Sequence, residues 1–301
     1  MTRTLDRPAA SPLFRPISTG RRLRNRLATA LVTAAFLLAV VPLLWVLYTV
    51  LRFGVKVVTS SAWWTHSLSG LLSFQAGGGV YHAIYGTLTQ ALVCAVFSIP
   101  IGLMVGIYLV EYGARSRLEK ITTFMVDILT GVPSIVAALF VYALWITILG
   151  FPRSGFAVSL ALVLLMVPVI VRTTEEMLRI VPNDLREASY ALGVPKWKTI
   201  VKIVIPTALS GIVTGIMLAL ARVMGETAPL LVLVGYAPFI NYNLFEGNMA
   251  ALPLVMVSER NNPTPAGVDR MWGAALTLVL LITLFNLLAT VVARRSAIKA
   301  K

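Results

Sequence analysis

The sequence predicts an all-α integral membrane protein with six transmembrane helices. Of its 301 residues, 58% are hydrophobic and only 13% are charged, and the mean hydropathy is +0.85. Soluble proteins carry about 25% charged residues, so this composition is too apolar for that class. Long apolar segments recur along the chain, each near the roughly 20 residues with which a helix crosses a bilayer. These observations predict a membrane domain over residues 27–293.

Six apolar segments are the expected spans. The first, at 27–51, is too long for the apolar core of a cleavable signal peptide, which has about 7 to 15 residues, so we expect it to be retained. The other five spans are expected at 81–110, 121–150, 155–171, 200–235 and 272–293. The remaining parts are a basic N-terminal tail, a loop between the fourth and fifth spans, an outer loop and a C-terminal tail, at 1–26, 172–202, 236–271 and 294–301.

The distribution of basic residues predicts the orientation. The chain has 26 Lys and Arg against 12 Asp and Glu, a formal net charge of +14. If the N-terminus is cytoplasmic, the pieces on that side carry 20 of the 26 basic residues and the opposite pieces carry five. Because cytoplasmic loops of membrane proteins are enriched in Lys and Arg, we expect both ends in the cytoplasm. This bias also accounts for the net charge, so a nucleic-acid partner is not expected.

Metal and disulfide chemistry have few residues to use. Cys94 is the single cysteine and lies in an apolar run, and the only histidines are His66 and His82. An intrachain disulfide is excluded, and we expect no metal site.

Two pairs of glycines, Gly102 with Gly106 and Gly211 with Gly215, stand four residues apart within the spans. This spacing lets helix backbones approach closely. Packing within one bundle is the simpler interpretation, and a dedicated dimerisation face is the alternative.

The loop at 172–202 predicts a short, exposed helix. Asn183 can cap its start, and Gly193 followed by Pro195 supplies a left-handed stop and a helix breaker. One face carries a weakly apolar stripe at helical spacing, formed by Leu185, Ala188, Ser189 and Leu192. Such a face fits a partner protein or the membrane surface.

The same loop resembles the EAA loop of ABC importer permeases. Glu187-Ala188-Ser189, Gly193 and Ile203–Pro206 keep the family spacing, with departures at Ser189 and Ile205, where the family has Ala and Leu. The resemblance implies a coupling helix that docks on a cytoplasmic ATPase subunit. Its docking residues would be Glu187, Ala188, Ser189, Leu192 and Gly193. The chain lacks a Gly-x4-Gly-Lys-Ser/Thr loop, so we expect no cofactor here, ATP and Mg on the partner, and no enzymatic activity of the chain.

The apolar run at 203–235 contains only two charges, Arg222 and Glu226. A continuous helix of this length would measure roughly 50 Å, more than a bilayer needs, so we expect breaks at Gly225 and Pro229. Charges inside a span are costly and usually mark a solute or ion path. A structural ion pair with another helix is the alternative. Arginine presents a planar fork of donors that suits phosphate or carboxylate oxygens, so the solute would be an anion.

A second break is expected in the third span, at Gly131, Pro133 and Ser134. Irregular backbone within a membrane is tolerated where it lines a cavity, so this break could face the path. A tight packing kink is the alternative.

The segment Arg222–Leu230 resembles the Arg-x-x-Gly-Glu-Thr-Ala-Pro segment of phosphate-specific ABC transporter permeases. Thr130–Val136 and Val171–Leu178 are similar to the same family, especially to its A-type subunit, and the likeness covers roughly residues 80–290. It implies a type I importer permease that forms half of a path for inorganic phosphate. The residues facing the path would be Arg222, Glu226, Thr227 and Ser134.

The resemblance also implies partners and a location. The partners would be a C-type permease, two ATPase subunits and an extracytoplasmic phosphate-binding protein, all at a bacterial plasma membrane. A sulfate or molybdate permease is the nearest alternative. An enzyme using Glu226 as a base is the alternative from another class, and it would need a second catalytic group.

Three further groups are expected at the edges of the membrane. Arg172, Glu175 and Glu176 should form a solvated rim at the end of the fourth span, and Asp127 should lie near the inner interface, outside the core site. Trp63 and Trp64 suit an interfacial aromatic belt.

Overall fold

The computed structural model describes residues 18–113 and 116–298, with backbone only for 292–298. Within these residues every regular element is a helix, which confirms the all-α prediction. The chain divides into two units, Met1–Thr49 and Val50–Lys301.

The first unit contains most of helix α1 (Thr19–Val58). The helix has 40 residues, so it extends beyond the predicted span at both ends. No residue in its most apolar stretch is buried inside the protein. An apolar stretch of this length suits a helix in a lipid environment. Residues 1–17 of the predicted tail at 1–26 lie outside the described residues. The rest of the tail is helical from Thr19 onward.

Five helical segments in the described residues are long and apolar enough to cross a membrane. Besides α1, they are α3 (Tyr81–Ile107) with the π-helical turn η1 (Tyr108–Tyr112), α6 (Gly155–Ile180), the run α8 (Lys196–Thr199), η3 (Ile200–Val204) and α9 (Ile205–Met224), and α12 (Pro265–Ile298).

The predicted third span is a bent pair of helices. It consists of α4 (Arg117–Gly131) and of α5 (Ser134–Val141), which continues into the π-helical segment η2 (Tyr142–Ile148). The two parts are bent by 105° at the break, and counting them as one span gives six.

Helix α6 is the central helix of the second unit, and α3 and α9 pack against it through glycines. A Cβ atom added to Gly102 would lie 2.6 Å from Cγ2 of Ile170, and one added to Gly215 would lie 2.6 Å from Cβ of Thr173. The other glycine of each pair, Gly106 on α3 and Gly211 on α9, faces α6 in the same way, at Thr174 and Met177. The glycine pairs therefore serve packing within one bundle, as the simpler interpretation predicts.

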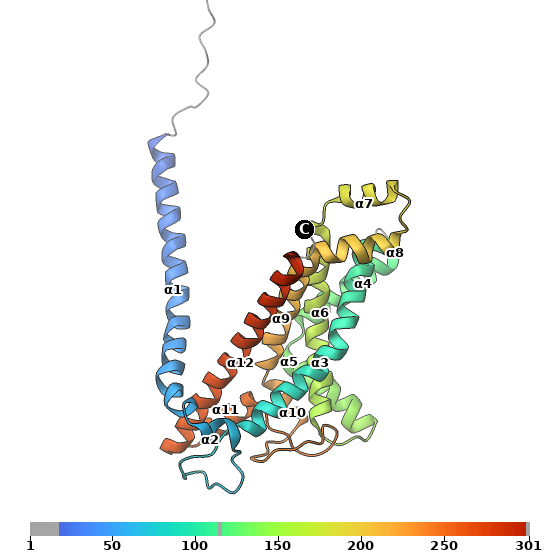
Figure 1. The fold of residues 1–301 in the computed structure, drawn as a ribbon. Coiled ribbons are helices and arrows are strands. Elements are labelled where there is room, and N and C mark those ends of the chain that lie inside the picture. Colours follow the sequence, from blue (N-terminus) through green and yellow to red (C-terminus); the bar gives the residue numbers. More distant parts are fainter. Residues whose placement is uncertain (1–17, 114–115, 299–301) are drawn as a thin grey trace, which may run out of the picture. The chain divides into compact units, whose positions relative to one another are not determined.

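The short helices of the second unit lie at its two ends (Figure 1). One end carries α7 (Asn183–Ala191) and α8, together with the C-terminal end of α12. The opposite end carries α2 (Ser61–Thr65), α10 (Ala228–Leu233) and α11 (Leu252–Arg260). The predicted outer loop at 236–271 is thus partly helical, because Leu252–Val255 bury apolar side chains in α11.

Candidate functional site

Arg222 and Glu226 lie where α9 ends. Gly225 follows the last helical residue and donates its N–H to the carbonyl of Arg222 at 3.1 Å. Pro229 occupies the first turn of α10, where its missing N–H costs no hydrogen bond. Gly225 therefore lies between α9 and α10, and Pro229 lies at the start of α10.

The geometry leaves the guanidinium of Arg222 largely available. Its Nε lies 3.9 Å from Oε1 of Glu226, which is too long for a hydrogen bond. The side chain of Arg222 is 58% exposed, whereas that of Glu226 is 17% exposed. In the described part of the chain Glu226 is the ionic partner of Arg222. The donor fork can thus bind an anion while the carboxylate stays at the protein wall.

A small cavity lies behind Glu226. The centre of a water molecule can occupy a volume of about 10 Å³ in this cavity. That is room for a single water. Nε2 of Gln90 is buried there without a hydrogen-bond partner. Thr87 also borders the cavity, and its hydroxyl accepts the N–H of Leu252 at 2.9 Å. The remaining lining residues are apolar: Ala91, Leu162, Val223, Met224, Leu230 and Ala251.

The two interrupted segments come together in the fold. Helix α5, which follows the break at 131–134, packs against α10, which follows the break after α9. Gly131 and Pro133 are exposed and Ser134 is half-buried at the start of α5. Thr227 is also half-buried, and its hydroxyl lies 3.5 Å from the carbonyl of Gly225. Among the described contacts, Ser134 makes no hydrogen bond to Arg222 or Glu226.

The charged group at the end of α6 differs from the expected solvated rim. The side chain of Glu175 is only 9% exposed and accepts hydrogen bonds from Arg172 and Arg179, each at 2.8 Å. Two guanidinium groups compensate the burial of this carboxylate, and for that reason the prediction is wrong for Glu175. Arg172 also pairs with Asp127, so Asp127 connects α4 with α6. Glu176 remains exposed.

The short helix that the sequence predicts in the loop at 172–202 is present as α7. Gly193 follows it with φ of +74°, the left-handed stop that the sequence predicts. Pro182 holds the position before the helix, so the predicted cap at Asn183 is wrong. The side-chain oxygen of Asn183 instead accepts a hydrogen bond from Arg186 at 3.3 Å.

The stripe on α7 is divided between two sides. Leu192 is 83% exposed, and Glu187 and Ala188 are also exposed. Ser189 is buried, and its hydroxyl bonds that of Thr199 at 2.8 Å, which joins α7 to the end of α8. The expectation that Ser189 shares the exposed face is therefore wrong, because its hydroxyl finds a partner inside the protein.

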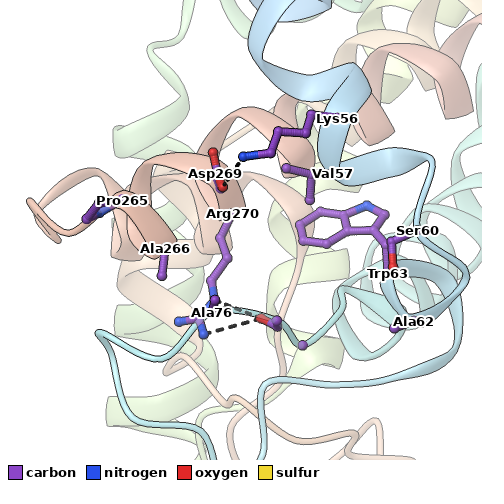
Figure 2. Close-up of a pocket in the computed structure, with 12 residues that line it drawn as sticks. Lys56, Val57, Ser60, Ala62, Trp63, Ala76, Pro265, Ala266, Asp269 and Arg270 are labelled. Atoms are coloured by element: carbon purple, nitrogen blue, oxygen red, sulfur yellow. Dashed lines mark hydrogen bonds and ion pairs between the residues drawn. The ribbon is translucent and has the colours of Figure 1, made fainter.

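A pocket of about 260 Å³ lies at the opposite end of the unit (Figure 2). Arg270 reaches from α12 to the loop before α3 and donates to the carbonyl of Gly77 at 3.3 Å, as drawn in Figure 2. It also donates to the carbonyl of Gln75 at 2.6 Å. These carbonyls, and Glu259 at 3.8 Å from Nη1, hold the guanidinium of Arg270 in place, so Arg270 connects α12 to this loop. Trp63 is buried beside it, with its indole N–H on Thr277 at 2.9 Å. The interfacial-belt prediction is wrong for Trp63, whereas Trp64 is 39% exposed.

Comparison with known proteins identifies the family. The model of the family "binding-protein-dependent transport system inner membrane component" matches residues 98–298. The phosphate transport system permease protein PstA 1 of Mycobacterium tuberculosis is 59% identical over 288 residues, which cover 96% of this chain and 94% of the relative. PstA of Yersinia pestis is 40% identical over 272 residues, or 90% of each chain.

Solved structures have the same fold. An ABC transporter that imports the acidic polysaccharide alginate aligns with a TM-score of 0.63 at 12% identity, over 90% of this chain and 96% of that one. The inward-facing MetNI methionine ABC transporter aligns with a TM-score of 0.61 at 22% identity, over 72% and 95%. The chain belongs to the binding-protein-dependent transport system inner membrane components, and within them to the PstA permeases.

Proposed function

We propose that this permease subunit forms half of the translocation path of an ATP-driven importer of inorganic phosphate. The observation that carries the proposal is Arg222, a half-exposed guanidinium at a helix break within an apolar run, with its carboxylate partner 3.9 Å away. Such a group can donate two parallel hydrogen bonds to phosphate oxygens. The names of the PstA relatives support phosphate as the anion.

The proposed partners are a C-type permease, two ATPase subunits and an extracytoplasmic phosphate-binding protein. The exposed residues of α7 offer a docking face for an ATPase, and the sequence lacks a phosphate loop, so ATP and Mg would be held by that partner. The C-terminal end of α12 lies at the same end as α7 (Figure 1), which supports a cytoplasmic C-terminus. The basic residues support a cytoplasmic N-terminus at a bacterial plasma membrane.

The proposed mechanism is alternating access driven through α7. The helical run from Lys196 to Met224 begins next to α7 and ends beside Arg222. Movement of α7 and α8 with the ATPase would tilt this run and carry Arg222 with it. The anion would then be exposed to one side of the membrane at a time, without any chemistry in this chain.

The test is phosphate uptake by charge variants of the ion pair. We expect Arg222→Gln to reduce uptake of radiolabelled phosphate at least tenfold, the effect of losing about 1.4 kcal/mol or more of anion binding. The double variant Arg222→Gln with Glu226→Gln leaves no unpaired charge in the membrane. If Arg222 attracts the anion, this double variant also fails to transport.

Two outcomes would contradict the proposal. Near-normal uptake by the double variant, at matched protein levels in the membrane, would mean that the pair is only structural. Uptake of radiolabelled sulfate or molybdate that excess phosphate does not inhibit, together with absent uptake of phosphate, would mean that the substrate is another oxyanion.

A further inference from the structure

A buried ion pair connects α7 to the end of α3. Glu111 lies in η1, and Arg186 lies in α7, 75 residues later in the chain. Nε and Nη2 of Arg186 donate to the same oxygen, Oε1 of Glu111, at 3.1 and 2.8 Å. The side chains are only 4% exposed for Glu111 and 12% for Arg186. The pair is therefore a fixed connection between two elements and not a solvated surface contact.

The same guanidinium also holds the end of α6. Nη1 of Arg186 donates to the carbonyl of Val181 at 2.7 Å, and Nη2 donates to that of Leu178 at 3.0 Å. The last carbonyls of a helix have no partner within the helix, and Arg186 donates to this end of α6 in addition to the N–H of Val181, which bonds Leu178. One side chain of α7 thus joins α3 and α6, two of the long helices of the bundle.

Helix α8 is attached to the same turn. Lys196 donates its ammonium group to the backbone carbonyl of Glu111 and lies 4.8 Å from the ring centre of Tyr112. The hydroxyl pair of Ser189 and Thr199 joins α7 to α8. The turn that receives these contacts is π-helical, and single π-helical turns are frequent at functional sites.

We propose that Arg186 and Glu111 form the joint that transmits the movement of α7 to the bundle, so that both are positioning residues for transport. The proposal rests on the function proposed above, in which α7 docks on an ATPase. The exposed residues of α7 and Leu192, which directly follows it, would contact the partner, while Arg186 is directed into the permease. From Glu111, α3 leads roughly 30 Å back to Gln90, beside the cavity of Glu226. Without the joint, α7 would follow the ATPase while α3 and α6 would not.

The test separates docking, ATP hydrolysis and transport in the assembled complex. Arg186→Gln and Glu111→Gln each remove the charge pair and leave the exposed face of α7 unchanged. We expect the ATPase to co-purify as with the wild type and to hydrolyse ATP. Phosphate imported per ATP hydrolysed in proteoliposomes should fall at least tenfold. Arg186→Lys keeps the positive charge and should retain more coupling than Arg186→Gln.

Arg179→Gln is the matched control. Arg179 stands at the same end of the bundle, but its side chain is 57% exposed and its carboxylate partner lies within α6. We expect the ratio of phosphate to ATP to stay within twofold of the wild type in this variant.

Two results would overturn the proposal that Arg186 and Glu111 form this joint. The first is an unchanged ratio of phosphate to ATP in both Arg186→Gln and Glu111→Gln. The second is loss of ATPase co-purification together with uptake in Glu111→Gln and in Arg186→Lys, which would mean that the pair serves folding or docking. Failure of the wild-type complex to bind an ATPase or to import phosphate would instead refute the proposed function.

Discussion

The carboxylate of Glu226 is largely buried, and its cationic partner lies beyond hydrogen-bond distance. Partial burial of a carboxylate is costly, so a further hydrogen-bond donor beside Glu226 would stabilise its charge. Gln90 supplies an amide nitrogen that is itself buried and unpartnered in the same cavity. Both groups are satisfied at once if a single water bridges them, and the cavity has room for one. Gln90 would then hold the carboxylate in place, and through it the guanidinium.

Replacing Gln90 tests this bridge. Gln90→Met keeps the size of the side chain and removes the donor, and we expect uptake to fall about tenfold or more, the contribution of one hydrogen bond to a charged group. Gln90→Glu adds a second carboxylate beside Glu226 and should abolish uptake, since like charges there repel. Initial rates of phosphate uptake at equal protein levels measure both effects. Gln75→Met, in the loop before α3, is the control, and wild-type rates in both Gln90 variants would exclude the bridge.

At the level of helices, hydropathy predicts most of the spans because apolar length is a local property of the sequence. The break at Pro133 also follows from local chemistry, but the 105° bend depends on packing of α5 against α10 and α6. Helix α6 continues to Ile180, beyond its apolar part, because Glu175 is paired with arginines on both sides. The contact of Glu111 with Arg186 joins distant segments, and no pattern within one sequence relates them.

The left-handed stop after α7 depends on conformation alone. Gly193 has φ of +74°, and a Cβ atom added there would meet nothing within 4 Å. Gly193→Val should therefore disturb α7 only through the backbone, at a cost of about 1–2 kcal/mol or more for a β-branched residue. Gly193→Asn is the control, because asparagine tolerates this conformation. We expect the valine variant to lose ATPase co-purification and uptake and the asparagine variant to retain most of both, and equal behaviour of the two variants would contradict this account.

In the second unit, two continuous helical runs lead from the end that carries α7 toward the ion pair of Arg222 and Glu226. One is the run from α8 to α9, whose last turn contains Arg222. The other is η1 with α3, which leads from Glu111 to Gln90. Both pack on α6, so they can shift together as rigid elements. The proposed connection of α7 to the proposed anion site at Arg222 therefore runs through helices and a few buried polar contacts, so a movement at one end can displace the whole connection.

The proposed orientation can be tested by labelling cysteines, because the native Cys94 is fully buried and should give no background. Leu192→Cys directly after α7 and Phe74→Cys in the loop before α3 introduce thiols at positions that are 83% and 64% exposed. With an impermeant maleimide we expect Phe74→Cys to react in intact spheroplasts and Leu192→Cys to react only after permeabilisation. Ser18→Cys should behave like Leu192→Cys, since the basic residues before the first span favour the cytoplasm. Labelling of Leu192→Cys in intact spheroplasts would mean that the orientation is the reverse of the proposed one. Helix α7 could then not contact a cytoplasmic ATPase.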